Sequence, residues 1–237
     1  TNYVAYFETL RETLLEFEMT RKEDEAPRLT TVQDYHSESL LENDLKLKLA
    51  EWHYPVWDTS TTEGDINDVK AETRRLMTLK SYHVLDSTSE SDFDELTKQA
   101  QDYFKVPVAV VSLVDAGRQW FKSVQGFPAT ETPRCVSFCQ HVVKRKERVG
   151  PMIVEDATKD ERFKNNPFVA GPPNVAFYAG APLRTPEGDI IGTFCIIDFQ
   201  ARKLTNVEIR RLEVFAQEAV FLIITRVPTS SHRRAST

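Results

Sequence analysis

Cysteine is scarce in this chain of 237 residues, which carries Cys135, Cys139 and Cys195. A small and odd number of cysteines in a large domain is unlike the disulfide framework of a compact secreted protein. The sequence therefore argues against a small secreted protein whose loops are held together by disulfides. We expect free thiols, a reducing compartment and a cytoplasmic location.

Long hydrophobic runs are also missing, since no apolar stretch approaches the ~20 residues that a membrane-spanning helix needs. The chain opens at Thr1 without an initiator methionine and without the basic and apolar segments of a signal peptide. These absences predict a protein with no membrane span, and the opening residue suggests a fragment or a processed chain. With 41% hydrophobic residues, the chain can still bury a substantial core.

Basic side chains are few in the first part of the chain. Residues 1–70 hold 7 basic and 16 acidic side chains, whereas residues 71–237 hold 23 and 20. This asymmetry predicts two different modules. The second module has no stripe of lysine and arginine interleaved with exposed aromatic residues, so we expect no nucleic-acid partner.

Helical periodicity marks the acidic part. Apolar residues recur at steps of three and four over residues 3–17 and again over 39–52. Residues 53–64 are expected to form a linker, and a third helix is expected over about 68–82. We expect three regions: an acidic helical extension with its linker over 1–66, a folded domain over 67–226 and a disordered basic tail over 227–237.

The folded domain mixes strands and helices without regular alternation. Helices are expected from Ser91, which would act as the cap, and from Thr205, which would form a capping box with Glu208. This order predicts an α+β fold with an antiparallel sheet. The expected strands are 106–114, 119–124, 152–155, 177–183 and 190–197, with a short helix over 138–145 and a helical turn within 160–173.

The segment 177–198 is the most informative one. Two runs rich in β-formers flank the sequence Pro186-Glu187-Gly188-Asp189, which predicts a β-hairpin because proline and glycine favour the dihedral angles of a turn. The second run is apolar on both alternating faces. It therefore predicts a central strand covered on both sides, in a sheet able to enclose a small ligand.

Several separated motifs resemble the GAF domain family. In chain order they read FDELTKQAQDYFKVPVAVVSLVD, RQWFKS, PRCVSFCQH, DATKDERF, FYAGAPL and GTFCIID. The resemblance covers about residues 72–226 and is greatest to the sensory GAF domains that precede bacterial histidine kinases and diguanylate cyclases. It implies a GAF-type antiparallel β-sheet flanked by helices. It also implies that a signal leaves through a partner or an output domain beyond the chain, or not at all.

The candidate site residues each have two interpretations. Cys139 and His141 stand two positions apart on a helix and point about 200° from each other, so they do not chelate one metal; either one lines a cavity or both are packing residues. Asp160 and Arg162 either bind polar ligand groups or pair on the surface. The residues predicted to bind a ligand are Phe138, Cys139, His141, Asp156, Asp160, Arg162, Phe163, Phe177 and Tyr178.

Known chemistries of GAF relatives fit this sequence poorly. Gln140 separates Cys139 from His141, whereas bilin-attaching relatives place the two residue types side by side. The three cysteines are not spaced like those of methionine-R-sulfoxide reductases, and the cyclic-nucleotide signature is not intact. Because no nucleophile, base and orienting group assemble, we expect no enzymatic activity, and the cofactor is left open.

The sequence predicts a sensory or regulatory GAF domain that binds a small molecule or a partner protein and transmits through its terminal helices. The apolar stripes over 69–79 and 209–222 suit a homodimer. The alternative is a GAF fold that serves as a structural or docking subunit with a closed pocket. In the tail, two arginines precede Ser236 in the manner of a basophilic kinase site, which predicts phosphorylation there.

Overall fold

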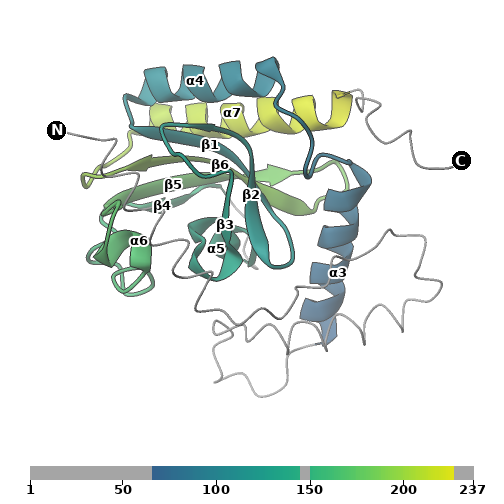
Figure 1. Ribbon diagram of the computed structural model, residues 1–237, viewed down its shortest axis with the longest axis horizontal. Coiled ribbons are helices and arrows are strands. Elements are labelled where there is room, and N and C mark those ends of the chain that lie inside the picture. The colour runs from purple at the N-terminus through teal and green to yellow at the C-terminus, as the bar shows by residue number, and fades with distance from the viewer. Residues whose placement is uncertain (1–65, 145–149, 227–237) are drawn as a thin grey trace, which may run out of the picture.

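The computed structural model describes residues 66–144 and 150–226 (Figure 1). The helices expected over 3–17 and 39–52, the linker and Ser236 lie outside these ranges. Within them, no helix is long and apolar enough to cross a membrane. The helices are α3 (Ile66–Ser81), α4 (Ser91–Phe104), the 3-10 turn η2 (Arg134–Val136), α5 (Phe138–Lys144), α6 (Pro167–Ala170) and α7 (Asn206–Thr225). The strands are β1 (Val108–Val114), β2 (Arg118–Gln125), β3 (Glu131–Pro133), β4 (Met152–Val154), β5 (Phe177–Arg184) and β6 (Ile190–Asp198).

The strands form one antiparallel sheet in the order β3-β2-β1-β6-β5-β4, which confirms the predicted α+β fold. The β5–β6 hairpin is also confirmed: the Thr185 amide donates to the Asp189 carbonyl at 2.9 Å, and Gly188 has φ +89°. Strands β1 and β6 make the centre of the sheet, while β5 lies one place further out. The hairpin therefore supplies one of the two central strands.

Both faces of the sheet are covered because its strands are apolar at successive positions. In β1, Ala109, Val111 and Leu113 face one core, whereas Val108 and Val110 face the other. This division follows from the two-residue period of a strand. The sheet thus separates two hydrophobic cores, and each core has its own helices.

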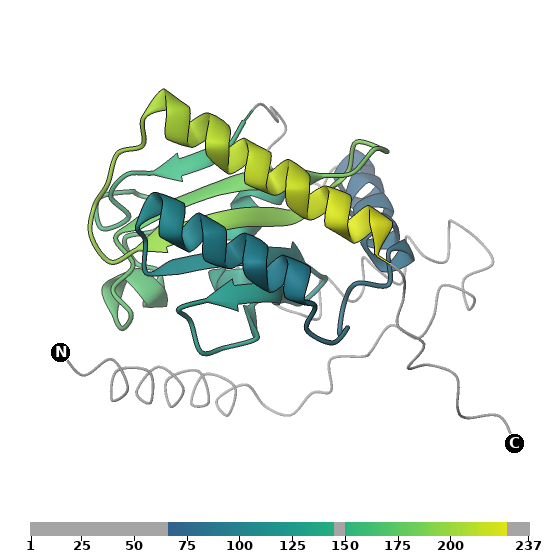
Figure 2. The ribbon, with the colours of Figure 1, turned by 90° about the horizontal axis from the view of Figure 1, so that it is seen from above.

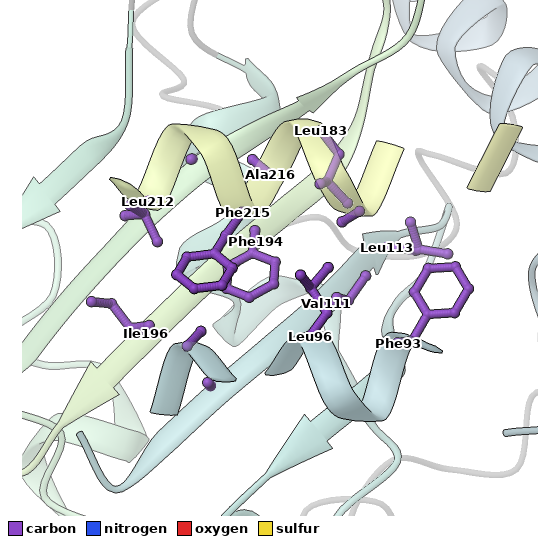
Figure 3. Close-up of a cluster of buried hydrophobic side chains, with 14 of the residues drawn as sticks. Phe93, Leu96, Val111, Leu113, Leu183, Phe194, Ile196, Leu212, Phe215 and Ala216 are labelled. Carbon is purple, nitrogen blue, oxygen red and sulfur yellow. The ribbon is translucent and has the colours of Figure 1, made fainter. Parts of the chain in front are cut away.

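Helices α4 and α7 lie side by side over the first face (Figure 2). Phe194 of β6 stacks on Phe215 of α7 with ring centroids 5.3 Å apart, and Leu212 and Ala216 join this core (Figure 3). Helix α7 begins at the predicted capping box, in which the Thr205 hydroxyl accepts from the third helical amide. Burial of this aromatic layer is the main contribution of α7 to stability.

Several details differ from the sequence-based expectation. Ser91 is the first residue of α4 and does not cap it, because Glu90 occupies the cap position without a side-chain bond. Tyr103 points outward and is 47% exposed, although it follows the apolar spacing of α4. Strand β3 and η2 were not predicted, because Glu131–Pro133 has no apolar run like that of the equally short β4, Met152–Val154.

Helix α3 stands at one end of the sheet (Figure 1) and is attached through buried polar groups. Asp189, in the β5–β6 turn, is 2% exposed and accepts from Arg74 Nε at 2.9 Å and Thr78 Oγ1 at 2.8 Å. At another point Glu72 pairs with Arg75 of α3 itself and with Arg134 of η2. These contacts fix the end of the hairpin to a helix that precedes the sheet in the chain.

Candidate functional site

A cavity of about 50 Å³ lies on the sheet face opposite α4 and α7, next to α5. Strands β1, β2, β5 and β6 supply its floor, and the segment containing α6 supplies one wall. Most of its lining is apolar. The lining residues are Val108, Val110, Gln119, Phe121, Phe127, Thr132, Val136, Ser137, Phe138, Cys139, Phe168, Pro173, Val175, Tyr178 and Ile197.

Cys139 is the centre of a buried polar cluster at this cavity. Its sulfur accepts a hydrogen bond from Thr193 Oγ1 at 3.0 Å and from the Tyr178 hydroxyl at 3.3 Å, and Cys195 Sγ lies 3.9 Å away. The Tyr178 hydroxyl occupies the space beside Gly180, where an added Cβ would lie 2.1 Å from the hydroxyl oxygen. A glycine at position 180 is therefore what allows the tyrosine to reach the thiol.

Hydrogen bonding gives the two buried thiols different acidities. Burial alone would raise the pKa of Cys139, but the donors Cys195, Thr193 and Tyr178 lower it to about 6. The hydrogen bond with Cys139 and burial raise the pKa of Cys195, and burial raises the pKa of Tyr178. Cys139 is thus the group of this cluster that loses its proton first.

Aromatic rings form one side of the cavity. The ring of Phe138 stacks on the rings of Tyr178 and Phe163, with centroids 5.1 Å and 4.2 Å away. These contacts hold α5 against β5 and the loop before α6. At the outer end the rings of Phe127 and Phe168 meet edge to face at 6.4 Å, and both side chains are partly exposed. Together with Val136 and Ile197, these two rings are the partly exposed residues of the lining.

His141 was predicted to bind a ligand but does not line the cavity, because it points away from Cys139 on α5. The His141 ring meets the Phe163 ring edge to face, with the two centroids 4.8 Å apart. Burial, then the charges of Lys144 and Arg162, lower the pKa of His141 to about 4, so the ring is neutral at pH 7. In the described ranges, no group of three His, Cys, Asp or Glu side chains is placed to hold a metal ion.

The remaining predicted residues are dispersed. Asp160 accepts from Arg162 Nη2 at 2.6 Å, which is the surface pair anticipated as the alternative, and Asp156 accepts from the Thr158 amide at 3.1 Å in a turn. Phe177 lies on the opposite face of the sheet, in the core beneath α7, and cannot line this cavity. Of the nine predicted residues, Phe138, Cys139 and Tyr178 line the cavity.

Sequence reasoning missed most of the cavity lining. Val108 and Val110 alternate along β1, and that two-residue period was a signal for one shared face. Phe127, Phe168 and Val175 come from turns and short segments, where no periodicity indicates which side chain points inward. Their positions depend on contacts between segments distant in the chain.

A model of the GAF domain family matches residues 90–223. The chain belongs to the GAF domain family. The matched range contains every strand of the sheet as well as α5, so the cavity lies within the GAF domain. The resemblance seen in the sequence motifs is thereby confirmed.

Among curated proteins, the chain is 40% identical over 147 residues to a cyclic di-GMP phosphodiesterase from Pseudomonas aeruginosa. The match covers 62% of this chain and 24% of that protein, so the chain spans about a quarter of its relative's length. We expected no enzymatic activity. That expectation is wrong, because a relative with this degree of similarity is named as an enzyme.

Solved structures similar to this chain include the GAF domain of an Acinetobacter phosphoenolpyruvate-protein phosphotransferase, with a TM-score of 0.46 and 20% identity over 64% of this chain and 93% of that one. A free methionine-R-sulfoxide reductase from Neisseria meningitidis has a TM-score of 0.46 and 16% identity, covering 69% and 93% of the two chains. At these identities and scores, neither carries an argument about function.

Proposed function

We propose that this chain is the regulatory GAF domain of an enzyme that hydrolyses cyclic di-GMP, and that it acts in the cytoplasm. The observation that carries the proposal is the 40% identity to a cyclic di-GMP phosphodiesterase. Because the similarity covers about a quarter of that protein, it fits one domain of a larger enzyme. In this role the GAF domain binds a small molecule and alters the rate of hydrolysis.

The cavity beside Cys139 supports the binding step and limits the ligand. Its volume of about 50 Å³ is well below the roughly 300–1,000 Å³ of pockets that hold drug-sized molecules. The ligand is therefore either a molecule of a few heavy atoms or one that binds when the cavity widens. Cyclic di-GMP itself is too large for the cavity as it stands.

Helices α3 and α7 are suited to transmit the binding event. Helix α3 holds Asp189 in the β5–β6 turn, and α7 stacks Phe215 on the central strand β6. A shift of the sheet on ligand binding would therefore move both helices. The proposal includes a homodimer formed through α7, which exposes Val207, Val214 and Phe221. The α7 stripe that was expected to serve the dimer packs in the domain's own core instead, through Leu212, Phe215 and Ala219.

A domain exchange tests the regulatory role. Residues 66–226 replace the matching region of the Pseudomonas phosphodiesterase, and cyclic di-GMP hydrolysis is measured for the chimera and for its Val175→Phe variant, which fills the cavity. We expect the variant to change the rate of hydrolysis at least severalfold. The control is Val169→Phe, which enlarges a buried residue that does not line the cavity. Equal rates for the chimera and the cavity variant would refute the regulatory role.

The alternative is a closed domain that serves as a structural or docking unit. The stacking of Phe138, Phe163 and Tyr178 favours it, because these rings already fill much of the space beneath α5. Native mass spectrometry and the absorption spectrum of the purified chain distinguish the two roles. Added mass that is lost in Val175→Phe supports a ligand, whereas an empty protein of unchanged mass supports the closed domain.

A further inference from the structure

Cys139 and Cys195 form a buried thiol pair that connects α5 to the central strand β6. They are 56 residues apart in sequence, yet their sulfurs lie 3.9 Å apart and each residue is 1% exposed. A disulfide requires about 2.05 Å, so the sulfurs must approach by about 1.8 Å. Rotation of the Cys139 side chain toward Cys195 would close this gap, and it would break the hydrogen bonds from Thr193 and Tyr178.

The two sulfurs are chemically unequal. Cys139 accepts hydrogen bonds from Thr193 and Tyr178, and such donors stabilise a thiolate. Cys195 keeps its proton, since its pKa is raised by the hydrogen bond with Cys139 and by burial. The pair therefore consists of one nucleophilic sulfur and one sulfur that reacts second.

Cys139 is also the more accessible of the two sulfurs. Cys139 lines the cavity of about 50 Å³, whereas Cys195 lies behind it and is not among the lining residues. A cavity of this size holds a molecule of two or three heavy atoms, since a single water needs about 10–15 Å³ by a comparable measure. A small hydroperoxide that entered this cavity would reach Cys139 first.

We propose that Cys139 and Cys195 are an oxidation site at which a small hydroperoxide produces an intramolecular disulfide. The Cys139 thiolate attacks one peroxide oxygen, the O–O bond breaks, and the departing oxygen takes a proton to leave as water or an alcohol. Cys139 is now a sulfenic acid. The Cys195 sulfur attacks the Cys139 sulfur, the S–O bond breaks, and the hydroxyl group leaves as water with the Cys195 proton. Two thiols are oxidised by two electrons, and the peroxide is reduced.

The disulfide would change the cavity that it borders. Thr193 and Tyr178 lose their common acceptor, and α5 becomes covalently attached to the centre of the sheet. The proposal does not depend on the domain's role in cyclic di-GMP hydrolysis, because it rests on the thiol geometry alone. Its readout is a covalent bond and not an enzymatic rate.

The test uses the full chain carrying Cys135→Ser, because Cys135 and Cys139 otherwise fall in one tryptic peptide, residues 135–144. The folded protein is treated with hydrogen peroxide, denatured in iodoacetamide, digested without reductant and analysed by mass spectrometry. We expect peptide 135–144 joined to peptide 185–202 and released by dithiothreitol. Recovery of both cysteines in alkylated form would overturn the proposal.

Two further variants distinguish the roles of the sulfurs. In Cys195→Ser, peroxide should leave Cys139 as a sulfenic acid that dimedone traps, with no linked peptide. Thr193→Val removes one donor at nearly constant shape and should slow disulfide formation about tenfold. Unchanged kinetics in Thr193→Val would overturn the assignment of Cys139 as the attacking sulfur. Thermal melting followed by circular dichroism checks folding, and the linked peptide in the Cys135→Ser chain remains decisive if these variants unfold.

Discussion

Glu72 is the carboxylate that neutralises two buried guanidinium groups. Its Oε1 lies 2.7 Å from Arg75 Nη2 and 2.6 Å from Arg134 Nη1, and both arginine side chains are at most 5% exposed. Arg75 also donates to the Val114 carbonyl, and Arg134 to the Asp115 carbonyl. The group therefore joins α3, the end of β1 and η2 in one network.

Glu72→Gln should destabilise the domain by about 3 kcal/mol, because it removes the carboxylate that pairs with the buried Arg75 and Arg134 side chains. Burial would raise the pKa of Glu72, but Arg75 and Arg134 lower it to about 2. Because the pKa of Glu72 is lower in the folded protein, the stabilisation that this carboxylate gives is complete above pH 4.5. It declines as the pH falls toward 2. Urea denaturation at pH 7 and pH 3 should show a smaller difference between variant and wild type at pH 3. The exposed Glu161→Gln is the control, and an equal loss at both pH values would contradict the prediction.

The sequence predicted individual site residues less well than it predicted the fold. Cys139 and Tyr178 were identified from motifs, but the bond between them depends on the absence of a side chain at Gly180, which no local pattern indicates. Phe177 was placed at the site because adjacent strand residues face opposite sides and either one was eligible. Which of Phe177 and Tyr178 faces the cavity is decided by the pairing of β5 with β6, which the sequence does not reveal.

At the scale of elements, three segments meet at Glu90. Lys122 Nζ of β2 lies 2.6 Å from Glu90 Oε1, with the lysine side chain wholly buried. Arg226, which follows α7, donates to the same oxygen at 2.9 Å and to the His83 carbonyl at 2.7 Å. One carboxylate thus joins the start of α4, the middle of β2 and the end of α7.

Glu90→Gln should therefore release the end of α7. We expect a loss of about 2 kcal/mol, less than for a fully buried pair because the Glu90 side chain is 26% exposed. Lys122→Met should cost less, since Glu90 then keeps Arg226 as its partner and an apolar chain replaces a buried cation. Urea unfolding compares the two, and amide exchange in the last turn of α7 should be faster in Glu90→Gln alone. A larger loss in Lys122→Met would show that the lysine, and not the carboxylate, holds the elements together.

Elements with strong periodicity were predicted from the sequence, and elements fixed by tertiary contacts were not. The capping box of Thr205 and the turn at Gly188 are local signals, so α7 and the hairpin appeared at the expected positions. Strand β3 exists because Glu131, Thr132 and Pro133 pair with β2, and η2 follows it directly. Strand β3 lacks an apolar run like that of β4, so only its pairing with β2 defines it.

At the scale of the molecule, the outer side of α7 is more apolar than a solvated helix face needs to be. Val207 and Phe221 are 60% and 64% exposed, and Val214, midway between them, is also exposed. The three recur every seven residues and lie on one line along the helix, which is the spacing that brings two helices together. A helix of 20 residues is about 30 Å long, enough to contribute to a dimer interface of roughly 800 Å² per partner.

Phe221→Glu should convert a dimer of this chain into a monomer, because it places a charge on the line where two copies of α7 would meet. Sedimentation velocity over a range of concentrations measures the change, and we expect the dissociation constant to rise at least about a hundredfold, the effect of losing a buried aromatic contact. Gln200→Glu adds the same charge at an exposed position before α7 and should leave the dimer intact. Retention of the dimer in Phe221→Glu, or a wild-type chain that is monomeric at every concentration, would rule out assembly through this face of α7.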